Sequence, residues 1–451
     1  MNLKFVLLGG IALLSVQGAN AAVSADDAKK LGASLTAVGA EAGANKDGSI
    51  PAYTGGQTTA PAGFDKASGV RPDPFAGEKP VVTITGANMD KYADKLTEGT
   101  KALLKKYSDY KVEVYPTHRS VALPKSVQEN TVKNATRAKT SEGGRVLEAA
   151  SAGYPFPIPA NGFEAMWNHL TRYVGVAYEA KYGSYNIDSS GHAVLATAGQ
   201  AWEQYPYYIE HKDAESGDSD LFYQIKVAYS APARRAGEAL LLWDSVNPVE
   251  KGRRAWQYLP GQRRVKLAPD IAYDTPNPGT AGTTTYDDSF IFNGAMDRYD
   301  FKLLGKKEIY IPYNDYRLVY APKSEDVATP KFANPDLTRW ELHRVWVVEA
   351  DLLPGARHIY AKRTFYLDED SWIAVAADSY DAKGQLFRAG FAFLTPSYDV
   401  LAPFADTAAF YDYVAGTWSL YTHIGAQGLH YTDPLPAKEW SSGSLAANGI
   451  R

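Results

Sequence analysis

Residues Leu337 to Leu394 constrain the fold more than any other stretch, because they predict four consecutive strands joined by short turns. Apolar and polar side chains alternate along each run, and Asp368 to Ser371 and Asp381 to Gly384 supply turn residues. This period of two between Asp- and Gly-containing turns is typical of an antiparallel meander with one apolar face. That face must be covered by protein, by a ligand or by both. The four runs are 338–350, 359–367, 372–380 and 385–394.

The N-terminus has the pattern of a signal peptide. Lys4 is followed by the apolar run Phe5 to Val16 and then by the small residues Ala19-Asn20-Ala21. A membrane anchor is the less favoured alternative, because the apolar run is too short to span a bilayer. We therefore expect residues 1–21 to be a signal peptide that is cleaved near Ala21, and the mature chain to be exported and soluble.

Composition narrows the class of protein further. The chain has no cysteine, which excludes lipid attachment at a cysteine, disulfides and thiolate metal sites. Its 451 residues carry a formal net charge of −4 without a basic patch, so nucleic-acid binding is not expected. The 31 Tyr, 9 Trp and 16 Phe are numerous. Tyrosine suits interfaces and cavity mouths, because it combines an apolar ring with a polar hydroxyl.

The order of the expected elements predicts an α+β fold. Helices and extended segments prevail in the first third of the chain, whereas apolar residues repeat with a period of two from Gly175 onwards. Helices followed by a run of antiparallel strands indicate α+β architecture and not a parallel sheet. The predicted organisation is a signal peptide (1–21), an N-terminal helical and extended wrapping segment (22–150), a β-rich domain (151–425) and a C-terminal tail (426–451).

Two segments are expected to form helices that plug the sheet, and a long loop is a candidate lid or binding loop. Asn161 with Glu164 three residues later predicts the start of a helix that buries the apolar residues of 163–173. The aromatic stretch 404–418 predicts a second, closing helix. The long polar loop 270–288 is typical of a lid or a binding loop, because loops of this length are uncommon in compact domains.

A search for catalytic motifs gives no match. The sequence has no G-x-S-x-G elbow, no G-x-G-x-x-G after a strand and no Walker-type phosphate loop. His343 and His358 lie on neighbouring expected strands and could approach one another, but a structural role is favoured over metal binding. We therefore expect no enzymatic activity, no metal and no cofactor.

Arginines interrupt the apolar alternation of the meander, and Arg253-Arg254 and Arg263-Arg264 flank a Pro-Gly turn. An inward-facing arginine needs partners, because a lone buried charge is costly. One hypothesis is an internal ion-pair network with three candidate acids, Glu349, Asp351 and Asp378. The other is a set of anchors at a cavity mouth that hold the head group of a ligand. The candidate ligand-binding residues are then Trp340, Leu342, Arg344, Trp346, Arg363, Phe365 and Arg388.

Three motifs in the sequence carry a resemblance to a known protein family. The first is Leu35-Thr36-Ala37-Val38-Gly39-Ala40-Glu41 with Asp47-Gly48-Ser49-Ile50-Pro51 and Gly55-Gly56. The second is Trp256-x-Tyr258-x-Pro260-Gly261-x-Arg263-Arg264-Val265, and the third is Tyr299-x-Phe301-x-Leu303-x-Gly305-Lys306-Lys307. Together these motifs resemble the DUF1329 proteins, and the similarity covers nearly the whole mature chain.

The resemblance implies a fold, a compartment and partners. DUF1329 proteins are secreted to the periplasm of Gram-negative bacteria and are described as similar to the outer-membrane lipoprotein-sorting proteins LolA and LolB. The implied fold is an incomplete antiparallel β-barrel with helices that cover or plug its concave side, here preceded by the long N-terminal segment. RND-type exporters and an outer-membrane protein of the DUF1302 family are the implied partners. The chain is about twice the size of a lipoprotein chaperone, so its first 150 residues have no counterpart there.

Two functions follow as hypotheses. The first is a periplasmic carrier or chaperone for a hydrophobic small molecule, a lipid or acyl chain, or a lipoprotein-like cargo, in transport to or through the outer membrane. The alternative is a non-catalytic accessory subunit that docks on an RND-type exporter or an outer-membrane barrel.

Overall fold

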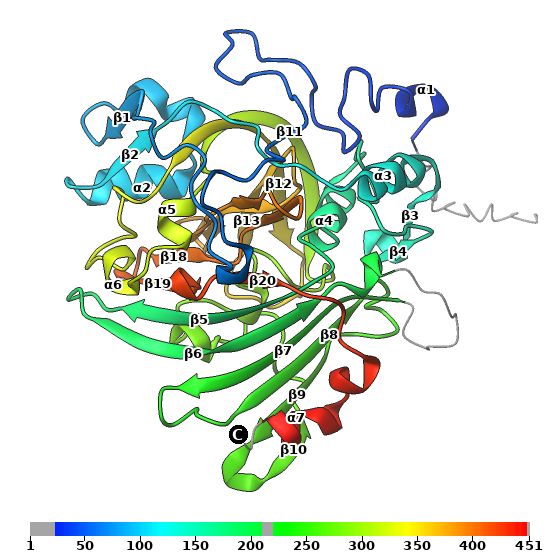
Figure 1. Cartoon of the computed structure of the whole chain (residues 1–451), viewed down its shortest axis with the longest axis vertical. Coiled ribbons are helices and arrows are strands. Elements are labelled where there is room, and N and C mark those ends of the chain that lie inside the picture. Colours follow the sequence, from blue (N-terminus) through cyan, green and yellow to red (C-terminus); the bar gives the residue numbers. More distant parts are fainter. Residues whose placement is uncertain (1–22, 210–219, 449–451) are drawn as a thin grey trace, which may run out of the picture.

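The computed structural model describes residues 23–209 and 220–448, so the predicted signal peptide lies outside the described residues. Within them, one large and mostly antiparallel sheet curves round without closing (Figure 1). Its strands are β1 (Val82–Thr85), β2 (Lys111–Val114), β5 (Ala177–Ile187), β6 (Ala193–Gln204), β7 (Leu221–Ala231), β8 (Ala239–Ser245), β9 (Arg254–Leu259), β10 (Arg264–Leu267), β11 (Tyr299–Pro312), β12 (Trp340–Leu352), β13 (Lys362–Asp368), β14 (Ala374–Tyr380), β15 (Leu386–Ala392), β18 (Ala408–Asp412), β19 (Thr417–His423) and β20 (Leu429–Tyr431).

The strand order shows how two halves form one sheet. It runs β1-β2-β12-β13-β14-β15-β18-β19-β5-β6-β7-β8-β9-β10, and in addition β11 pairs with β12 and β20 with β5. Figure 1 shows β5 to β8 sweeping across the lower half of the molecule and β11 to β13 in its upper half. Two small hairpins, β3 (Lys139–Ser141) with β4 (Val146–Glu148) and β16 (Thr395–Ser397) with β17 (Ala402–Phe404), lie apart from it. The predicted α+β class and incomplete β-barrel are confirmed.

The α-helices of the described residues are few and mostly short. They are α1 (Ala25–Ala28), α2 (Glu98–Lys106), α3 (Lys125–Arg137), α4 (Gly162–Leu170), α5 (Tyr316–Val319), α6 (Ser324–Val327) and α7 (Ser442–Asn448). None of these helices has the length and apolar character needed to cross a membrane.

The predicted meander is present as β12 to β15, which are neighbours in the sheet. The expectation of a single apolar face is wrong, because Trp340 to Arg344 are buried at five successive positions. Segments from the first third of the chain cover the polar side chains: Glu341 accepts a hydrogen bond from the backbone of His118 at 2.8 Å. Arg344 similarly donates to the carbonyl oxygen of Gly43 at 3.1 Å. The meander is therefore an internal layer.

The predicted start of a helix at Asn161 is confirmed in α4. The side chain of Asn161 accepts a hydrogen bond from the backbone N–H of Glu164 at 3.0 Å, which satisfies a donor of the first turn. Helix α4 contacts β11 and β12, and the ring of Trp167 lies 6.2 Å from that of Phe222 in β7. Because it touches both halves of the sheet, α4 covers the concave side.

The predicted helix at 404–418 is wrong, because this segment forms β17, β18 and the start of β19. Strands β18 and β19 join β15 to β5 and so connect the two halves of the sheet. Phe410, Tyr411 and Trp418 are buried between their neighbours. Aromatic residues favour strands that can bury them, and a short apolar run does not by itself distinguish helix from strand.

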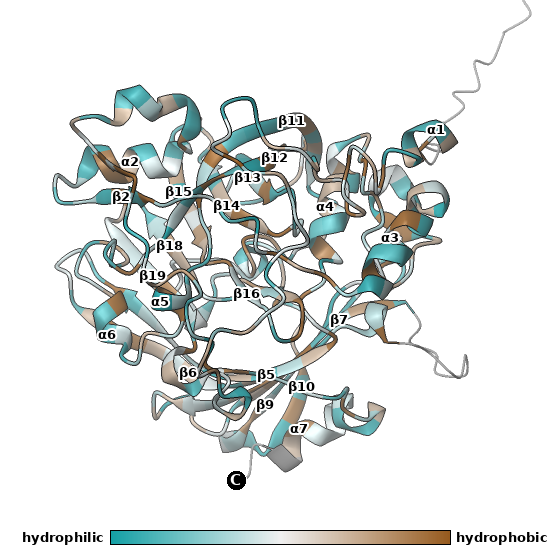
Figure 2. Ribbon diagram, turned by 45° about the horizontal axis from the view of Figure 1, so that its top comes forward, coloured by the Kyte–Doolittle hydropathy of each residue, from teal (hydrophilic) through white to brown (hydrophobic). Residues whose placement is uncertain are grey.

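Both ends of the described chain contribute to the same sheet. In the segment 22–150, β1 and β2 extend it through a parallel bridge between Val114 and Trp340. In the C-terminal tail, β20 pairs with β5, and α7 lies against β8, β9 and β10. Figure 2 shows α7 beside β9 and β10. Trp440 and Leu445 of the tail are buried there. The domain boundaries at 150 and 425 stay predictions.

Candidate ligand-binding site

A buried loop occupies the concave side of the sheet. Residues 268–298, here called the plug loop, connect β10 to β11 and include the polar loop that was expected to be a lid or a binding loop. Thr285, Ile291 and Phe292 are each about 1% exposed, so this segment is part of the interior. Thr285 and Asp288 form a capping box, in which Thr285 N donates to Asp288 Oδ2 at 2.8 Å. Such local bonds satisfy backbone groups that would otherwise be costly to bury.

Strand β13 anchors the plug loop through Arg363. Its Nη2 lies 2.7 Å from Asp288 Oδ1, and its Nη1 lies 3.2 Å from Asp287 Oδ2. His358 and Tyr360 add hydrogen bonds of 3.0 Å to Asp287 and 2.8 Å to Asp288. Burial alone would raise the pKa of Asp287, but the charge of Arg363 and the hydrogen bond from His358 hold it well below its usual range. The loop is therefore held in place by an ionised cluster.

A pocket opens between the plug loop, α4 and the ends of β7 and β8. Its volume is about 420 Å³. Its walls include five apolar side chains, Trp167, Leu170, Phe222, Val249 and Met296. One polar pair belongs to the wall, with Arg253 Nη2 2.7 Å from Asp244 Oδ2 and 2.6 Å from the carbonyl oxygen of Asn293. Apolar walls with a few fixed polar groups are the usual character of a small-molecule site.

A second, smaller cavity lies deeper, between the plug loop and the inner face of β5 to β8. Its volume is about 90 Å³, and it shares Arg253 and Asn293 with the outer pocket as lining residues. Its apolar lining includes Ile225, Val227, Leu240, Leu242 and Phe290. Phe290 belongs to the plug loop, so the loop itself limits the size of this inner cavity.

Two buried carboxyl groups meet a tyrosine at the wall of the inner cavity. The Tyr178 hydroxyl lies 2.9 Å from Glu203 and 2.7 Å from Asp406, and Tyr223 donates to Glu203 at 3.1 Å. The Tyr178 hydroxyl has one proton and can donate to only one of the two acids at a time, while Tyr223 supplies a second donor to Glu203. Burial raises the pKa of Glu203 to about 8, with a further contribution from the charge of Asp406, and burial raises the pKa of Asp406 to about 6.

The seven residues predicted to bind a ligand lie away from the outer and inner cavities just described. Trp340, Leu342 and Phe365 are buried in the hydrophobic core. Trp346 is half-buried and stacks on Trp372 with ring centroids 5.7 Å apart. Their direct contact with a ligand stays a prediction.

The three arginines of that set form ion pairs, so the part of the network hypothesis that gives them acidic partners is confirmed. Arg363 pairs with the plug loop, Arg344 with Glu369 at 3.1 Å, and Arg388 with Asp412 at 3.0 Å. The partners named from the sequence are wrong. Glu349 and Asp351 pair with lysines instead, and Asp378 accepts hydrogen bonds from the first backbone N–H groups of α2. The true partners are Glu369 in the turn after β13, Asp288 in the plug loop and Asp412 at the end of β18.

His343 and His358 are not brought together. His343 lies near the start of β12, whereas His358 follows the end of that strand, in the connection to β13. His343 pairs with Glu341 at 3.0 Å and His358 with Asp287 at 3.0 Å.

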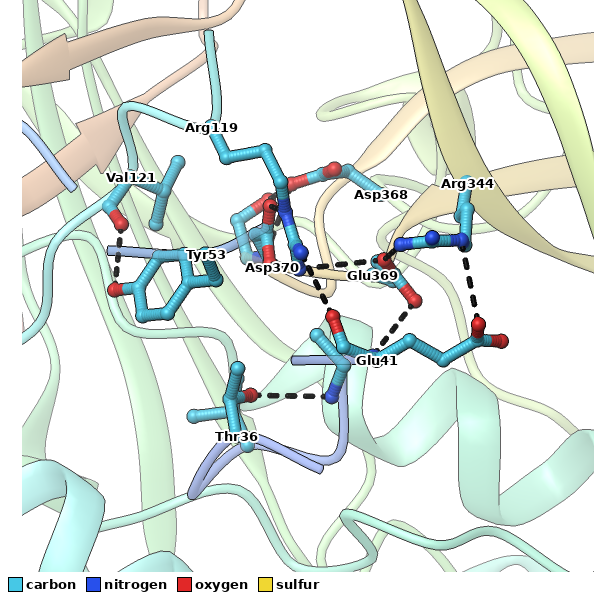
Figure 3. Close-up of polar contacts among 12 residues, drawn as sticks. Thr36, Glu41, Tyr53, Arg119, Val121, Arg344, Asp368, Glu369 and Asp370 are labelled. Carbon is cyan, nitrogen blue, oxygen red and sulfur yellow. Dashed lines mark hydrogen bonds and ion pairs between the residues drawn. The ribbon is translucent and has the colours of Figure 1, made fainter. Parts of the chain in front are cut away.

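The N-terminal motif of the family resemblance docks on the turn between β13 and β14 (Figure 3). Glu41 donates its backbone N–H to Glu369 at 3.2 Å and accepts a hydrogen bond from Arg119 at 2.7 Å. Arg119 also pairs with Asp370 at 2.6 and 2.9 Å. Nε of Arg344 lies 3.4 Å from the Glu41 carboxylate. The motif is therefore part of the buried polar network of the meander.

The family assignment follows from a comparison with known sequences. The family described as "Protein of unknown function (DUF1329)" matches residues 83–446, and the chain belongs to this family. An uncharacterized protein of Pseudomonas aeruginosa is 44% identical over 458 residues, which cover 99% of each chain. The resemblance stated from the motifs is confirmed.

Solved structures show more distant similarity. A proposed outer membrane lipoprotein-sorting protein domain from Vibrio parahaemolyticus is 17% identical, with a TM-score of 0.43, covering 63% of this chain and 98% of that one. A DUF1329 family protein from Desulfovibrio piger is 13% identical, with a TM-score of 0.41, covering 60% and 92%. A LolA superfamily protein from Nitrosomonas europaea is 13% identical, with a TM-score of 0.38, covering 63% and 98%.

Proposed function

We propose that this protein is a periplasmic carrier or chaperone that binds a hydrophobic molecule in transport to or through the outer membrane. The observation that carries the proposal is the pocket of about 420 Å³ beneath α4, whose walls combine large apolar side chains with polar ones. This volume lies within the range of roughly 300–1,000 Å³ that is usual for ligand pockets. The apolar run after Lys4, with its signal-peptide pattern, supports export.

The lining of the pocket favours an amphipathic ligand. Trp167, Phe222 and Met296 offer apolar contacts, and each methylene group that they remove from water contributes about 0.8 kcal/mol. Arg145 and Asp297 also line the pocket and are more exposed, so a polar head group would lie near them. An acyl chain, a lipid or the lipid anchor of a protein has this chemistry.

The test is to identify and measure the ligand. The full chain is purified from its own periplasm and extracted with organic solvent, and the extract is examined by mass spectrometry. A fluorescent fatty acid is then titrated into the delipidated protein. We expect a lipid-like molecule in the extract and saturable binding. Buffer components alone in the extract, together with no binding of the fatty acid, would sink the proposal.

Two variants locate the binding. Ala272→Trp places a large ring in the pocket, whereas Leu304→Trp places the same ring on an exposed position of β11 away from it. We expect the affinity for the fatty acid to fall at least about tenfold in the first variant, because the ring occupies the ligand volume. The second variant should bind as the wild type does. Equal binding by both variants would place the ligand elsewhere.

The exposed edge of the sheet favours the second candidate function, an accessory subunit of an RND-type exporter or an outer-membrane barrel of the DUF1302 kind. Strand β10 pairs only with β9 within the described sheet, and Leu267 at its end is 60% exposed. Edge strands with free backbone groups can pair with a partner. Cross-linking from position 267 in the native envelope tests this function, since a carrier that acts alone would give no specific adduct.

A further inference from the structure

Three side chains meet where the turn after β13 packs against β12. His343, Asp368 and Asp370 offer ligand atoms that lie within 4.8 Å of one another, and all three residues are buried. We propose that these residues form a structural site for a divalent metal ion of the zinc type. The ion would lie beneath the docked N-terminal motif, separate from the ligand pocket.

The orientation of His343 suits a metal ligand. Its Nε2 lies 3.0 Å from Glu341 Oε2, which leaves Nδ1 as the ring nitrogen available to an ion. A carboxylate that accepts the second N–H of a histidine is the usual support of a metal-binding imidazole, because it fixes the tautomer and the ring orientation.

The environment of Asp368 gives a second, independent indication that a cation binds here. Its Oδ2 accepts hydrogen bonds from Ser371 N at 2.9 Å and Ser371 Oγ at 2.6 Å. Its Oδ1 is buried and has no hydrogen-bond partner among the described residues. The hydroxyl of Tyr313, whose ring stacks on His343 at 3.8 Å, is also buried and unpartnered. Buried carboxylate oxygens without a partner are rare, and a cation is the kind of group that satisfies one.

The charges around the turn also favour a cation next to Asp368. Glu369 pairs with Arg119, Arg344 and Lys306, and Asp370 pairs with Arg119. Asp368 has no arginine or lysine partner in the part of the chain that the structure describes, although it is fully buried. A divalent ion between Asp368, Asp370 and His343 would neutralise it.

The donor set decides the class of ion. One imidazole nitrogen and two carboxylate oxygens suit Zn²⁺ better than the oxygen-seeking Mg²⁺ or Ca²⁺. Zinc ligands lie about 2.0–2.2 Å from the ion, so the three side chains would close in by about 1 Å. The site is covered by Glu41 and Arg119, so the ion would enter before the N-terminal motif docks. We therefore expect the bound ion to exchange slowly and to stabilise the folded chain.

The test is metal analysis of the full chain purified from cells grown with added zinc, with two matched variants. Asp368→Asn removes a proposed ligand, whereas Asp378→Asn changes another fully buried aspartate that lies outside the cluster. We expect about one zinc ion per chain in the wild type and in D378N, and at least about tenfold less in D368N. A wild type with only trace metal, or a D368N variant that retains as much zinc as the wild type, would overturn the site.

A second measurement needs no variant. Crystals of the wild type are examined at the zinc absorption edge, where we expect an anomalous peak between His343 and Asp368. Adding a chelator before thermal denaturation should also lower the melting temperature by on the order of 5 °C relative to the untreated protein, because an ion that binds only the folded chain stabilises it. An anomalous peak at another place, or no peak, contradicts the proposal even if D368N does not fold.

Discussion

Nη2 of Arg363 donates to Oδ1 of Asp288 at 2.7 Å, and this contact joins the central strand β13 to the plug loop. Both side chains are buried, so the pair is shielded from water. The arginine that was a candidate to hold a ligand thus holds a segment of the protein on the concave side of the sheet. By anchoring this loop, the meander fixes the position of Phe290 and Asn293, which line the inner cavity.

Replacing Arg363 tests this anchoring role. Arg363→Ala leaves Asp287 and Asp288 buried without their main cationic partner. We expect the free energy of unfolding to fall by about 3–5 kcal/mol, as is usual when one partner of a buried ion pair is removed. Chemical denaturation followed by tryptophan fluorescence measures the change.

The control for Arg363 is an exposed ion pair of the same sheet. Lys302 lies 2.7 Å from Asp351, and the two side chains are 52% and 39% exposed. Lys302→Ala should change the free energy of unfolding by no more than about 1 kcal/mol, because water screens the pair. If both variants lose the same stability, the anchoring role of Arg363 is wrong.

The buried acids Glu203 and Asp406 should make stability depend on pH. Their pKa values in the folded protein, about 8 and about 6, lie above the ordinary values of 4.5 and 3.8. Between these values the folded protein therefore holds protons that the unfolded chain has lost. The contribution of the two acids to stability is fully present at a pH below their ordinary pKa values, and it is lost as the pH rises to about 8. Denaturation midpoints measured between pH of about 5 and about 8 should decrease steadily.

A neutral variant isolates this effect. Glu203→Gln cannot ionise, so its stability should fall less steeply over the same range of pH than that of the wild type. Asp287 does not interfere, because its pKa lies well below the usual range and its contribution is lost only in stronger acid. An unchanged slope in E203Q would show that the Glu203 carboxyl does not titrate in this window.

The sequence predicts elements whose signal is local. The alternation within 338–394 predicts β12 to β15, and Asn161 with Glu164 predicts the start of α4, because strand period and helix capping are set by nearby residues. The same reasoning fails for 404–418, where clustered aromatic residues fit a helix or a strand and only pairing with β15 and β5 decides.

The candidate site is less predictable, because its residues come from separate segments. Asp244, Arg253 and Asn293 meet at the pocket wall from the end of β8, the turn before β9 and the plug loop. The Arg253-Arg254 doublet was a visible signal in the sequence, but its acidic partner could not be chosen. Asp244 has no local pattern that separates it from other aspartates, and the choice depends on how β8 and β9 pair.

The cap of α4 links helix stability to the ligand pocket. Asn161→Ala removes the acceptor for Glu164 N, and we expect a loss of about 1 kcal/mol in the free energy of unfolding. Ser24 caps the exposed helix α1 in the same way, since its hydroxyl accepts from Asp27 N at 3.1 Å. Ser24→Ala should cost less, because α1 buries no residue. Similar losses measured by thermal denaturation would contradict a special role for the α4 cap.

Gly39 decides whether the N-terminal motif can dock on the meander. Its φ is +87°, and a Cβ at this position would overlap the carbonyl oxygen of Pro157. Next to it, the carbonyl oxygen of Val38 accepts a hydrogen bond from Trp372 Nε1 at 2.9 Å, so the backbone cannot shift without breaking this contact. Gly39→Ala should therefore destabilise the protein by about 2–5 kcal/mol, from positive φ and overpacking together.

Gly48 gives a matched control, because its φ is +76° but no heavy atom would lie within 4 Å of an added Cβ. Gly48→Ala carries only the conformational strain, about 1–2 kcal/mol. Limited proteolysis separates the two variants: in G39A the segment before Tyr53 should be cut readily, because it no longer docks, whereas in G48A it should be protected as in the wild type. Equal protection of the segment in both variants would mean that the close approach of Gly39 to Pro157 does not hold the N-terminal motif in place.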